Sequence, residues 1–228
     1  MSVLTKMGSR MPAAMRIAES TFIVLFIVPV ICSPAGGHIP SQDVDVRAFN
    51  KKDGLPHEIV RDVVEGPDGS IWFATWGGGV ACCDGQEWRT FDETDGVPNN
   101  AVRCLLLDRN EHLWIGTREG IGFHNGQNWI AVEPDIPGIA TPSVFCVLER
   151  RDGSVWFGCT GETIIEWSPT PLAESTSPIE GLEQGQWSLA LKAEEDSPYN
   201  VRDMIEMDNG EVWVGLDKKG IIAWNGES

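Results

Sequence analysis

Short apolar stretches recur along the chain at a fixed distance, and a tight polar turn separates the members of each pair. Trp72, Trp114 and Trp156 are spaced 42 residues apart, and Trp213 follows after 57. Each Trp comes after an apolar segment and a turn that in most repeats contains Asp-Gly or Asn-Gly. Such dipeptides tolerate the positive φ that tight hairpin turns need. The pattern therefore predicts two paired antiparallel strands in every repeat.

Two further apolar stretches complete each repeat. A third stretch follows each Trp, and a second turn then leads to a fourth stretch that carries aromatic residues, as at 88–91. Four short strands in about 42 residues are typical of a β-propeller blade. The sequence thus predicts an all-β fold, a β-propeller in which four blades of four antiparallel strands are detected. The expected blades lie near 50–91, 92–132, 133–190 and 191–228.

The start of the repeat region indicates how the last blade is completed. Phe49 precedes Asp-Gly-Leu-Pro as Phe91 precedes Asp-Gly-Val-Pro, so 44–49 matches an outer fourth strand. We expect this strand to complete the blade at 191–228 and to remove its exposed edge. Four blades are compatible with a closed small ring, an open arc that pairs with another chain, or a fragment of a larger propeller. A stretch at 168–184, rich in Pro, Ser, Thr and Glu, is expected to be a surface-loop insertion.

The N-terminal segment has the pattern of a secretory signal. Basic residues precede an apolar run at 21–31, and small residues follow it, so 1–37 is predicted to be a signal peptide. The run is too short for a comfortable transmembrane helix. Cys32 offers a lipoprotein alternative, but Ile31 stands where a small residue would be expected. We expect residues 38–228 to form a periplasmic or secreted propeller with no membrane span.

The net charge of the chain argues against one class of partner. Its 228 residues include 17 Lys and Arg against 34 Asp and Glu, which gives a net charge of −17. Such a surface repels phosphate backbones, so nucleic acid is not expected as a partner. The hydrophobic content of 42% still permits a packed core and argues against wholesale disorder.

The repeat unit resembles the two-component regulator propeller repeat. The resemblance rests on Phe91-x3-Asp95-Gly96-Val97-Pro98-Asn99-Asn100-x-Val102 and on Leu113-Trp114-Ile115-Gly116-Thr117. The first two blades match this pattern almost throughout, whereas the third and fourth keep the Trp core and lose Asp-Gly-Leu-Pro. The resemblance implies the periplasmic sensor region of hybrid histidine kinases, which commonly reads carbohydrates or other nutrients. A sensor kinase or another propeller chain is the implied partner, and since no kinase domain is seen, direct signalling by this chain is not expected.

Candidate ligand contacts lie at the start of each predicted innermost strand. Each of these strands has a Val twelve residues before the repeated Trp, and the position after this Val is occupied by Arg61, Arg103, Phe145 and Arg202. Innermost strands line the channel of a propeller, so three arginines there predict a cationic ring for a carboxylate, sulfate or uronic-acid group. The alternative is that each arginine pairs with a neighbouring carboxylate, such as Asp62, and stabilises the wall.

The loops that enter these strands add further candidates. They crowd one face of a propeller, where a ligand is expected to enter, and Trp76 lies in the loop after a second strand, where it could stack on a sugar face. The alternative for the loop residues is turn chemistry, and for Trp76 it is packing. The remaining candidates are Asp53, His57, Asp95, Asn99 and Asn100.

No catalytic residue, metal site or cofactor is predicted. The four histidines lack metal-ligand spacing, and no phosphate loop or Ser–His–Asp order is found. Five cysteines beyond the signal segment are expected to act as buried small hydrophobes; they are Cys82, Cys83, Cys104, Cys146 and Cys159. The sequence favours a ligand-sensing or recognition propeller, with a saccharide as the candidate ligand. The alternatives are an extracytoplasmic carbohydrate-active enzyme on the same scaffold and a structural adaptor that docks another protein.

Overall fold

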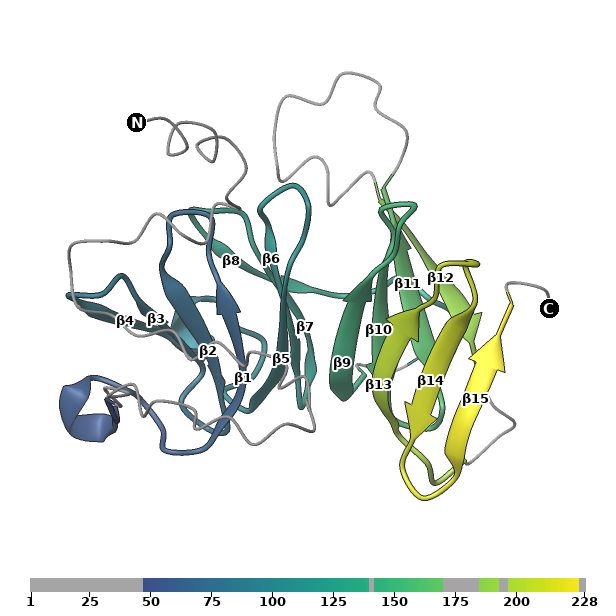
Figure 1. The fold of residues 1–228 in the computed structure, drawn as a ribbon, viewed down its shortest axis with the longest axis horizontal. Helices are drawn as coiled ribbons and strands as arrows, with labels where there is room; N and C mark the ends of the chain where they lie inside the picture. The colour runs from purple at the N-terminus through teal and green to yellow at the C-terminus, as the bar shows by residue number, and fades with distance from the viewer. Residues whose placement is uncertain (1–46, 140–141, 170–184, 193–196, 226–228) are drawn as a thin grey trace, which may run out of the picture. The chain divides into compact units, whose positions relative to one another are not determined.

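The chain folds into small antiparallel sheets, and we describe it from a computed structural model (Figure 1). The described residues are 47–139, 142–169, 185–192 and 197–225. Phe49–Ser228 forms one compact unit, to which the following description applies. The predicted signal peptide, most of the expected insertion and the first part of the expected strand at 44–49 lie outside the described residues. Within the described part, no helix has the length and apolar character needed to cross a membrane.

Four sheets, numbered here as blades one to four, account for all the strands of the described residues. Blade one contains β1 (Val60–Glu65), β2 (Ile71–Thr75), β3 (Val80–Cys83) and β4 (Trp88–Phe91). Blade two contains β5 (Val102–Leu107), β6 (Leu113–Thr117), β7 (Gly120–His124) and β8 (Trp129–Val132). Blade three contains β9 (Val144–Glu149), β10 (Val155–Cys159), β11 (Ile164–Ser168) and β12 (Gln186–Leu191). Blade four contains β13 (Val201–Glu206), β14 (Val212–Leu216) and β15 (Gly220–Trp224).

The predicted all-β propeller fold is confirmed, but the blades form an open row. Neighbouring strands in each sheet are consecutive in sequence, and the innermost strands pack in the order β1, β5, β9 and β13. The ends of this row are uncovered by other described residues, because Val63 on β1 is 57% exposed and Ile205 on β13 is 59% exposed. The described blades do not form the closed four-blade ring. The open row agrees with the two other arrangements that the sequence allowed, an open arc or a fragment of a larger propeller.

The first hairpin of each blade has the turn that the sequence indicates. Gly69, Gly153 and Gly210 adopt φ values of 81°, 90° and 84° in blades one, three and four. Blade two has no glycine at this turn, and Glu111 takes φ 65° there instead. The Asp-Gly and Asn-Gly dipeptides therefore mark hairpins because they supply this left-handed residue at low steric cost.

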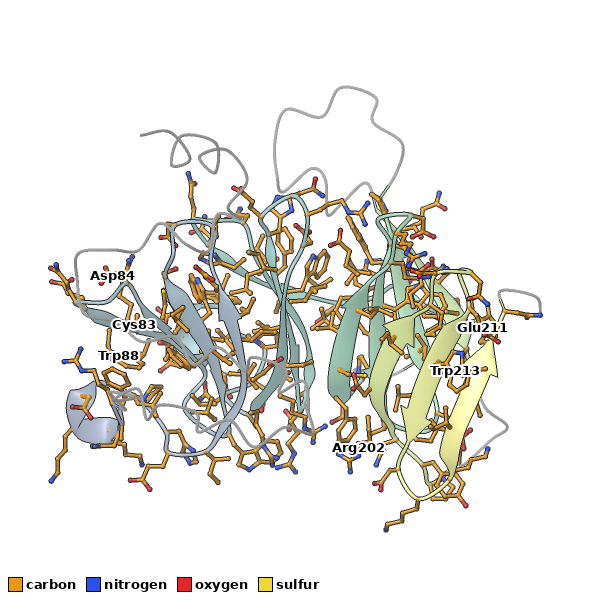
Figure 2. All side chains as sticks on the ribbon, viewed as in Figure 1. Cys83, Asp84, Trp88, Arg202, Glu211 and Trp213 are labelled. Atoms are coloured by element: carbon orange, nitrogen blue, oxygen red, sulfur yellow. The ribbon has the colours of Figure 1, made fainter. Side chains whose placement is uncertain are left out.

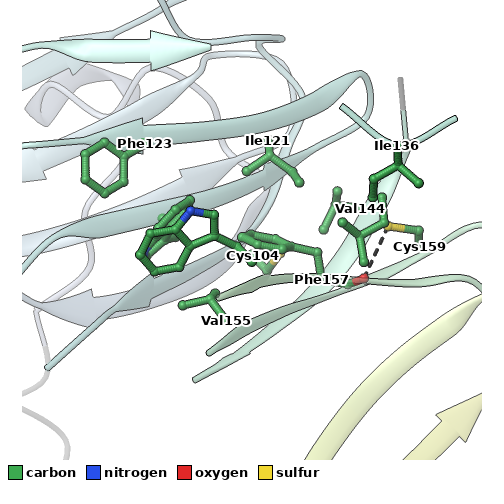
Figure 3. Close-up of a cluster of buried hydrophobic side chains, with 11 residues drawn as sticks. Cys104, Ile121, Phe123, Ile136, Val144, Val155, Phe157 and Cys159 are labelled. Carbon is green, nitrogen blue, oxygen red and sulfur yellow. Dashed lines mark hydrogen bonds between the residues drawn. The ribbon is translucent and has the colours of Figure 1, made fainter. Parts of the chain in front are cut away.

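The hydrophobic core lies between the blades rather than within any one of them. Three clusters of buried side chains join blades one and two, two and three, and three and four. Figure 3 shows the cluster between blades two and three, where Phe123 from β7 and Phe157 from β10 are both buried. Trp114 meets both rings edge-on, with centroids 4.7 Å from Phe123 and 5.5 Å from Phe157. Each blade is thus stabilised by the apolar surface of its neighbours.

The repeated Trp of the second strand faces the following blade in blades one, two and three. Trp72 belongs to the cluster with blade two, Trp114 to that with blade three and Trp156 to that with blade four. Their predicted role in packing between blades is confirmed. Trp213 occupies the same repeat position in blade four, where no described residue covers it, and it is 42% exposed.

The residue six positions before this Trp contacts the buried indole differently in blades two and three, and only the Trp114 N–H has an acceptor there, since Trp156 Nε1 has no hydrogen-bond partner among the described residues. In blade two it is Asp108, whose buried carboxylate accepts a 3.0 Å hydrogen bond from Trp114 Nε1 and bonds from the turn amides of Asn110 and His112. In blade three it is Arg150, whose guanidinium lies 4.6 Å from the centroid of the Trp156 ring. The same position therefore supports the Trp either by an acceptor or by a cation above the ring.

The segment before blade one packs as the sequence match with Phe91 suggests. Phe49 lies 5.7 Å from Trp88 of β4 between ring centroids, and Phe91 lies 5.8 Å from Trp129 of β8. Each Phe is followed by a short 3-10 turn, η2 (Lys51–Asp53) and η3 (Glu93–Asp95). The described end of the expected strand at 44–49 is not in a sheet, and blade four has three strands among the described residues. The completion of blade four by this strand stays a prediction.

The five cysteines that the structure describes are free thiols, and four of them are buried as expected. Burial raises the pKa of Cys104 and Cys159, and it raises the pKa of Cys146 to about 12. Thiols with such pKa values remain protonated at neutral pH and react slowly with electrophiles. Cys83 is the partly exposed member of the set.

We predict that replacing Asp108 with Ala lowers the free energy of unfolding by about 1–3 kcal/mol at neutral pH, because the buried Trp114 N–H loses its acceptor. Although burial opposes it, hydrogen bonding from His112 and Trp114 lowers the pKa of Asp108 below its usual 3.8. The carboxylate therefore stabilises the fold above the unfolded pKa, and this contribution is lost as the pH falls through the lower folded value.

Urea unfolding of the two proteins at pH 7 and below pH 4 checks this prediction, and the difference should shrink at the lower pH. Asp84→Ala is the matched control, since Asp84 also accepts two turn amides but holds no buried donor. An equal loss in both variants, or a difference that does not change with pH, would contradict the assigned role of Asp108.

We also predict that iodoacetamide modifies Cys83 before the other four described cysteines in the native protein. The reason is that Cys82, Cys104, Cys146 and Cys159 are buried, with pKa values raised by burial. Peptide mass spectrometry after graded alkylation at neutral pH, with the urea-unfolded chain as the reference, measures the order. Early modification of Cys104 or Cys146 would show that the blade interfaces are open in solution.

Candidate functional site

A β-bulge stands at the start of every innermost strand. Thr75 pairs with Val60 and Ala74 with Asp62, so the residue between Val60 and Asp62 has no partner on β2. The same skip occurs where β5, β9 and β13 pair with their neighbours. A bulge leaves one residue unpaired and turns its side chain in a new direction. The four residues placed in this way are Arg61, Arg103, Phe145 and Arg202.

These side chains and Trp76 form a row in which cations and rings alternate. The Arg61 and Arg103 guanidinium carbons lie 4.8 Å and 5.2 Å from the Trp76 ring centroid. Arg103 also lies 4.0 Å from the Phe145 centroid, and Arg202 lies 4.5 Å from it. The expected cationic ring is therefore a row, because the blades do not close around an axis. We call these five residues the arginine row.

The arginine row runs along the edge where the innermost strands begin. Figure 2 labels Arg202 at this edge, near the start of β13. Trp76 reaches the row because it follows β2 and bridges Ala101 just before β5. Each cation above a ring contributes about 0.5–1 kcal/mol when exposed and more when desolvated. The rings therefore hold neighbouring arginines in place without cancelling their charge.

The arginines of the row differ in their polar partners. Arg202 Nη2 lies 2.8 Å from Asp217 Oδ2, and Arg103 Nη1 donates a 2.7 Å hydrogen bond to Ser143 Oγ. No carboxylate of the described residues comes within ion-pair distance of Arg61 or Arg103. Burial, followed by the nearby charge of Arg202, lowers the pKa of Arg103. Two cations of the row are thus uncompensated in a strongly acidic protein.

The neighbouring aspartates do not neutralise the row. Asp62 Oδ1 accepts from Val63 N and its Oδ2 accepts from Leu105 N in blade two, both at 2.8 Å. Asp203 accepts a 2.9 Å bond from Met204 N. These carboxylates serve backbone amides, so the expected alternative of Arg–Asp pairs along the wall holds only for Arg202, through Asp217.

The predicted loop residues are used in their own turns. Asp53 and Asp95 accept bonds from the backbone N–H of Asn50 and Asp92, which cap the two 3-10 turns. Asn99 Oδ1 accepts from Ala101 N, and Asn100 exchanges two bonds with Glu93 across the loop. His57 Nδ1 accepts from Ile59 N at 3.1 Å. All five candidates shape the loops that lead to β1 and β5, and none of these hydrogen bonds connects them to an arginine of the row.

Three residues that contact the arginine row or act on its charge were not among the site residues predicted from the sequence. Phe145 was recognised as sharing the repeat position of the arginines, and the structure makes it the ring between two of them. Arg118 follows β6 as Trp76 follows β2, and its charge also acts on Arg103. Ser143 binds Arg103 from the residue before β9. Aligning the repeats by the position after the second strand could have found Arg118.

The described residues contain no cluster of three or more His, Cys, Asp or Glu side chains that could hold a metal ion. The chemistry that the row offers is recognition. Planar guanidinium groups stacked on rings keep their edge N–H donors in a fixed plane, which suits carboxylate or sulfate oxygens.

Comparison with known proteins agrees with the fold. The family described as two component regulator propeller matches residues 54–77 and 96–119, in blades one and two. No curated protein sequence matches the chain. Among solved structures, the extracellular domain of a B. thetaiotaomicron protein described as the hybrid two component system BT3049 has a TM-score of 0.61 at 15% identity, and the match covers 79% of this chain and 23% of that one.

Other structures extend the comparison. The extracellular domain described as the one component system BT4673 from B. thetaiotaomicron has a TM-score of 0.57 at 18% identity, with 72% of this chain and 20% of that chain covered. A virginiamycin B lyase from Staphylococcus aureus has a TM-score of 0.50 at 15% identity, with 75% and 57% covered. This chain spans about a fifth of the length of the two sensor domains.

The repeat spacing, the four blades and the matched segments lead to one assignment. The Gly-Leu-Pro of blade one, the Gly-Val-Pro of blade two and the Trp motifs of both blades lie inside the family matches, and the structural neighbours share the propeller fold. This chain is a β-propeller, and the family described as two component regulator propeller matches its first two blades at residues 54–77 and 96–119.

Proposed function

We propose that this chain is an extracytoplasmic recognition module whose arginine row binds the anionic groups of an acidic saccharide. The observation that carries the proposal is that Arg61 and Arg103 have no carboxylate partner among the described residues. Arg61 and Arg103 lie over the same Trp76 ring and the charges of the row repel one another, so a bound anion would stabilise the arrangement.

The geometry suits carboxylates carried on a repeating scaffold. The bulged positions recur once per blade, so the row presents guanidinium groups at the spacing of the innermost strands. A uronic-acid oligomer carries one carboxylate per sugar and can engage more than one arginine. Each charge-assisted hydrogen bond contributes about 1.5–3 kcal/mol.

The role of Trp76 changes in this proposal. Two guanidinium groups lie over its ring, so we expect the indole to orient Arg61 and Arg103 rather than to stack on a sugar. The loops that hold Asp53, His57, Asp95, Asn99 and Asn100 lead into β1 and β5, so they border the entrance to the row. Their turn bonds fix the backbone around the ligand.

The setting of this module is inferred from its relatives. The similar B. thetaiotaomicron structures are described as extracellular domains of one component and hybrid two component systems. By this similarity we propose a periplasmic or secreted location, ligand sensing as the task, and a sensor kinase or a second propeller chain as the partner. The signal-peptide pattern at 1–37 supports the same location.

We predict that Arg103→Ala weakens binding of an oligogalacturonide by about ten- to a hundredfold, because a charge-assisted bond of about 1.5–3 kcal/mol is lost. Isothermal titration calorimetry against the acidic oligomer and the neutral galacto-oligosaccharide of the same length measures the change. The neutral oligomer should bind weakly to both proteins, and added salt should weaken the acidic one.

Arg89→Ala is the matched control, since it removes an equal charge from an exposed arginine on β4 outside the row. The melting temperature of Arg103→Ala should stay within a few degrees of the parent. Equal binding of the acidic and neutral oligomers, or unchanged binding by Arg103→Ala, would return the row to a structural role. Release of reducing ends or unsaturated products from the oligomer would instead favour the enzyme alternative.

A further inference from the structure

Each blade offers one face to the blade before it and the other face to the blade after it, and among the described residues two faces remain without a blade. On the remaining face of blade four, Ile205, Trp213 and Ile221 are 59%, 42% and 67% exposed. On that of blade one, Val63 is 57% exposed and pairs across the sheet with Phe73. We call these the blade-four face and the blade-one face.

The two faces have the composition of the buried interfaces. Trp213 has the repeat position of Trp114 and Trp156, which are 0% and 1% exposed under the next blade. Phe73 stacks on Trp88 with ring centroids 5.3 Å apart. Figure 2 shows Trp88 and Trp213 at opposite ends of the row of blades. Apolar burial therefore favours the docking of a further blade on each face.

A polar contact at the first turn distinguishes one blade interface from another. Arg109, in the turn of blade two, donates its backbone N–H to Glu149 of β9 at 3.1 Å and also contacts this carboxylate through Nε. At the next interface, Arg151 N donates to Glu206 of β13 at 2.8 Å, and Arg150 Nη2 lies 3.3 Å from the same side chain. A basic turn thus meets a glutamate at the end of the next innermost strand.

The interface of blades one and two lacks both members of this contact. Pro67 stands at the position of Arg109, where it has no N–H to donate, and Leu107 stands at the position of Glu149. The amide donor and its carboxylate acceptor are absent together. At each of the three interfaces between described blades, the basic turn residue and the glutamate at the strand end are therefore either both present or both absent.

The blade-four face and the blade-one face do not match in this way. The turn position of blade four is Asp208, and the strand-end position of blade one is Glu65. Pairing the two faces would set Glu65 beside Asp208, whose carboxylate already binds Arg151 of blade three, and the turn of blade four supplies no arginine of its own for Glu65. Like charges opposed across an interface disfavour that partner.

A second contact, in which an aspartate of one innermost strand accepts a backbone N–H of the next, would also be unfavourable if the two faces paired. Asp62 accepts the N–H of Leu105 across the interface of blades one and two, where Cys104 leaves this N–H free. Asp203 holds the position of Asp62 in blade four, so it would face the N–H of Val63 in blade one. Asp62 already accepts that N–H at 2.8 Å. Two carboxylates would then compete for one donor.

We infer that the blade-one and blade-four faces dock propeller blades of a different sequence, and that carboxylates select against self-pairing. The blade that covers blade one carries an arginine or lysine in its first turn, at the position of Arg109, to bind Glu65. The blade that covers blade four has no Asp at the position of Cys104, so that its next N–H can donate to Asp203. This inference is independent of the proposed saccharide site.

The test uses the chain as its own surrogate partner. Asp208→Arg installs the basic turn residue on the blade-four face, which should then bind Glu65 on the blade-one face of a second copy. Sedimentation velocity over a range of protein concentrations should show head-to-tail association at least about tenfold stronger than for the parent chain. Asp208→Arg combined with Glu65→Arg should return association to the parent level.

Two controls separate the designed contact from general effects. Asp208→Ala removes the exposed pair of Asp208 with Arg151 without adding an arginine, and it should fall between the parent and Asp208→Arg. Asp135→Arg makes the same charge change on an exposed loop outside both faces and should leave association unchanged. The inference is overturned if the parent associates as strongly as Asp208→Arg, if Asp135→Arg matches it, if Glu65→Arg has no effect on it, or if no variant associates.

Discussion

A blade of this propeller cannot bury its own apolar side chains, and this constraint governs the rest of the structure. A single sheet has two faces, and both carry apolar residues in every blade. The core consequently forms between sheets, with the Trp of the second strand covered by the blade that follows. Stability then depends on neighbours, as in other repeat proteins. Trp114 and Trp156 are buried because a blade follows them, whereas Trp213 is exposed because none does within the described chain.

The same repetition produces the arginine row. A bulge at the start of each innermost strand turns one side chain per blade out of the sheet, and three of the four are arginines. Phe145 and Trp76 separate the guanidinium groups, while Asp62 is held by backbone amides and does not compensate them. The arginine row therefore arises because the bulges fall at positions that carry arginine in three blades. The proposed recognition of an anion rests on this local arrangement.

Most of the fold could be predicted from the sequence because its signal is periodic. The spacing of Trp72, Trp114 and Trp156 and the Gly-containing turns indicate four-stranded blades, and Arg61 and Arg103 could be assigned to equivalent positions. Spacing does not report which ring lies between two cations, so the role of Phe145 was missed. Nor does it report whether four blades close, since closure depends on the fit between the first and last faces. The expected ring of arginines is a row for this reason.

Hydrogen exchange monitored by mass spectrometry tests most directly the claim that each blade is stabilised by the neighbour that covers it. The account predicts the slowest amide exchange in β6 and β10, which have blades on both sides, and clearly faster exchange in β14 and β15, whose outer face no described residue covers. The measurement should be made at low protein concentration, so that association does not cover the end faces. Equal protection from β2 through β15 would contradict the account, because it would mean that the end blades need no neighbour or already have one.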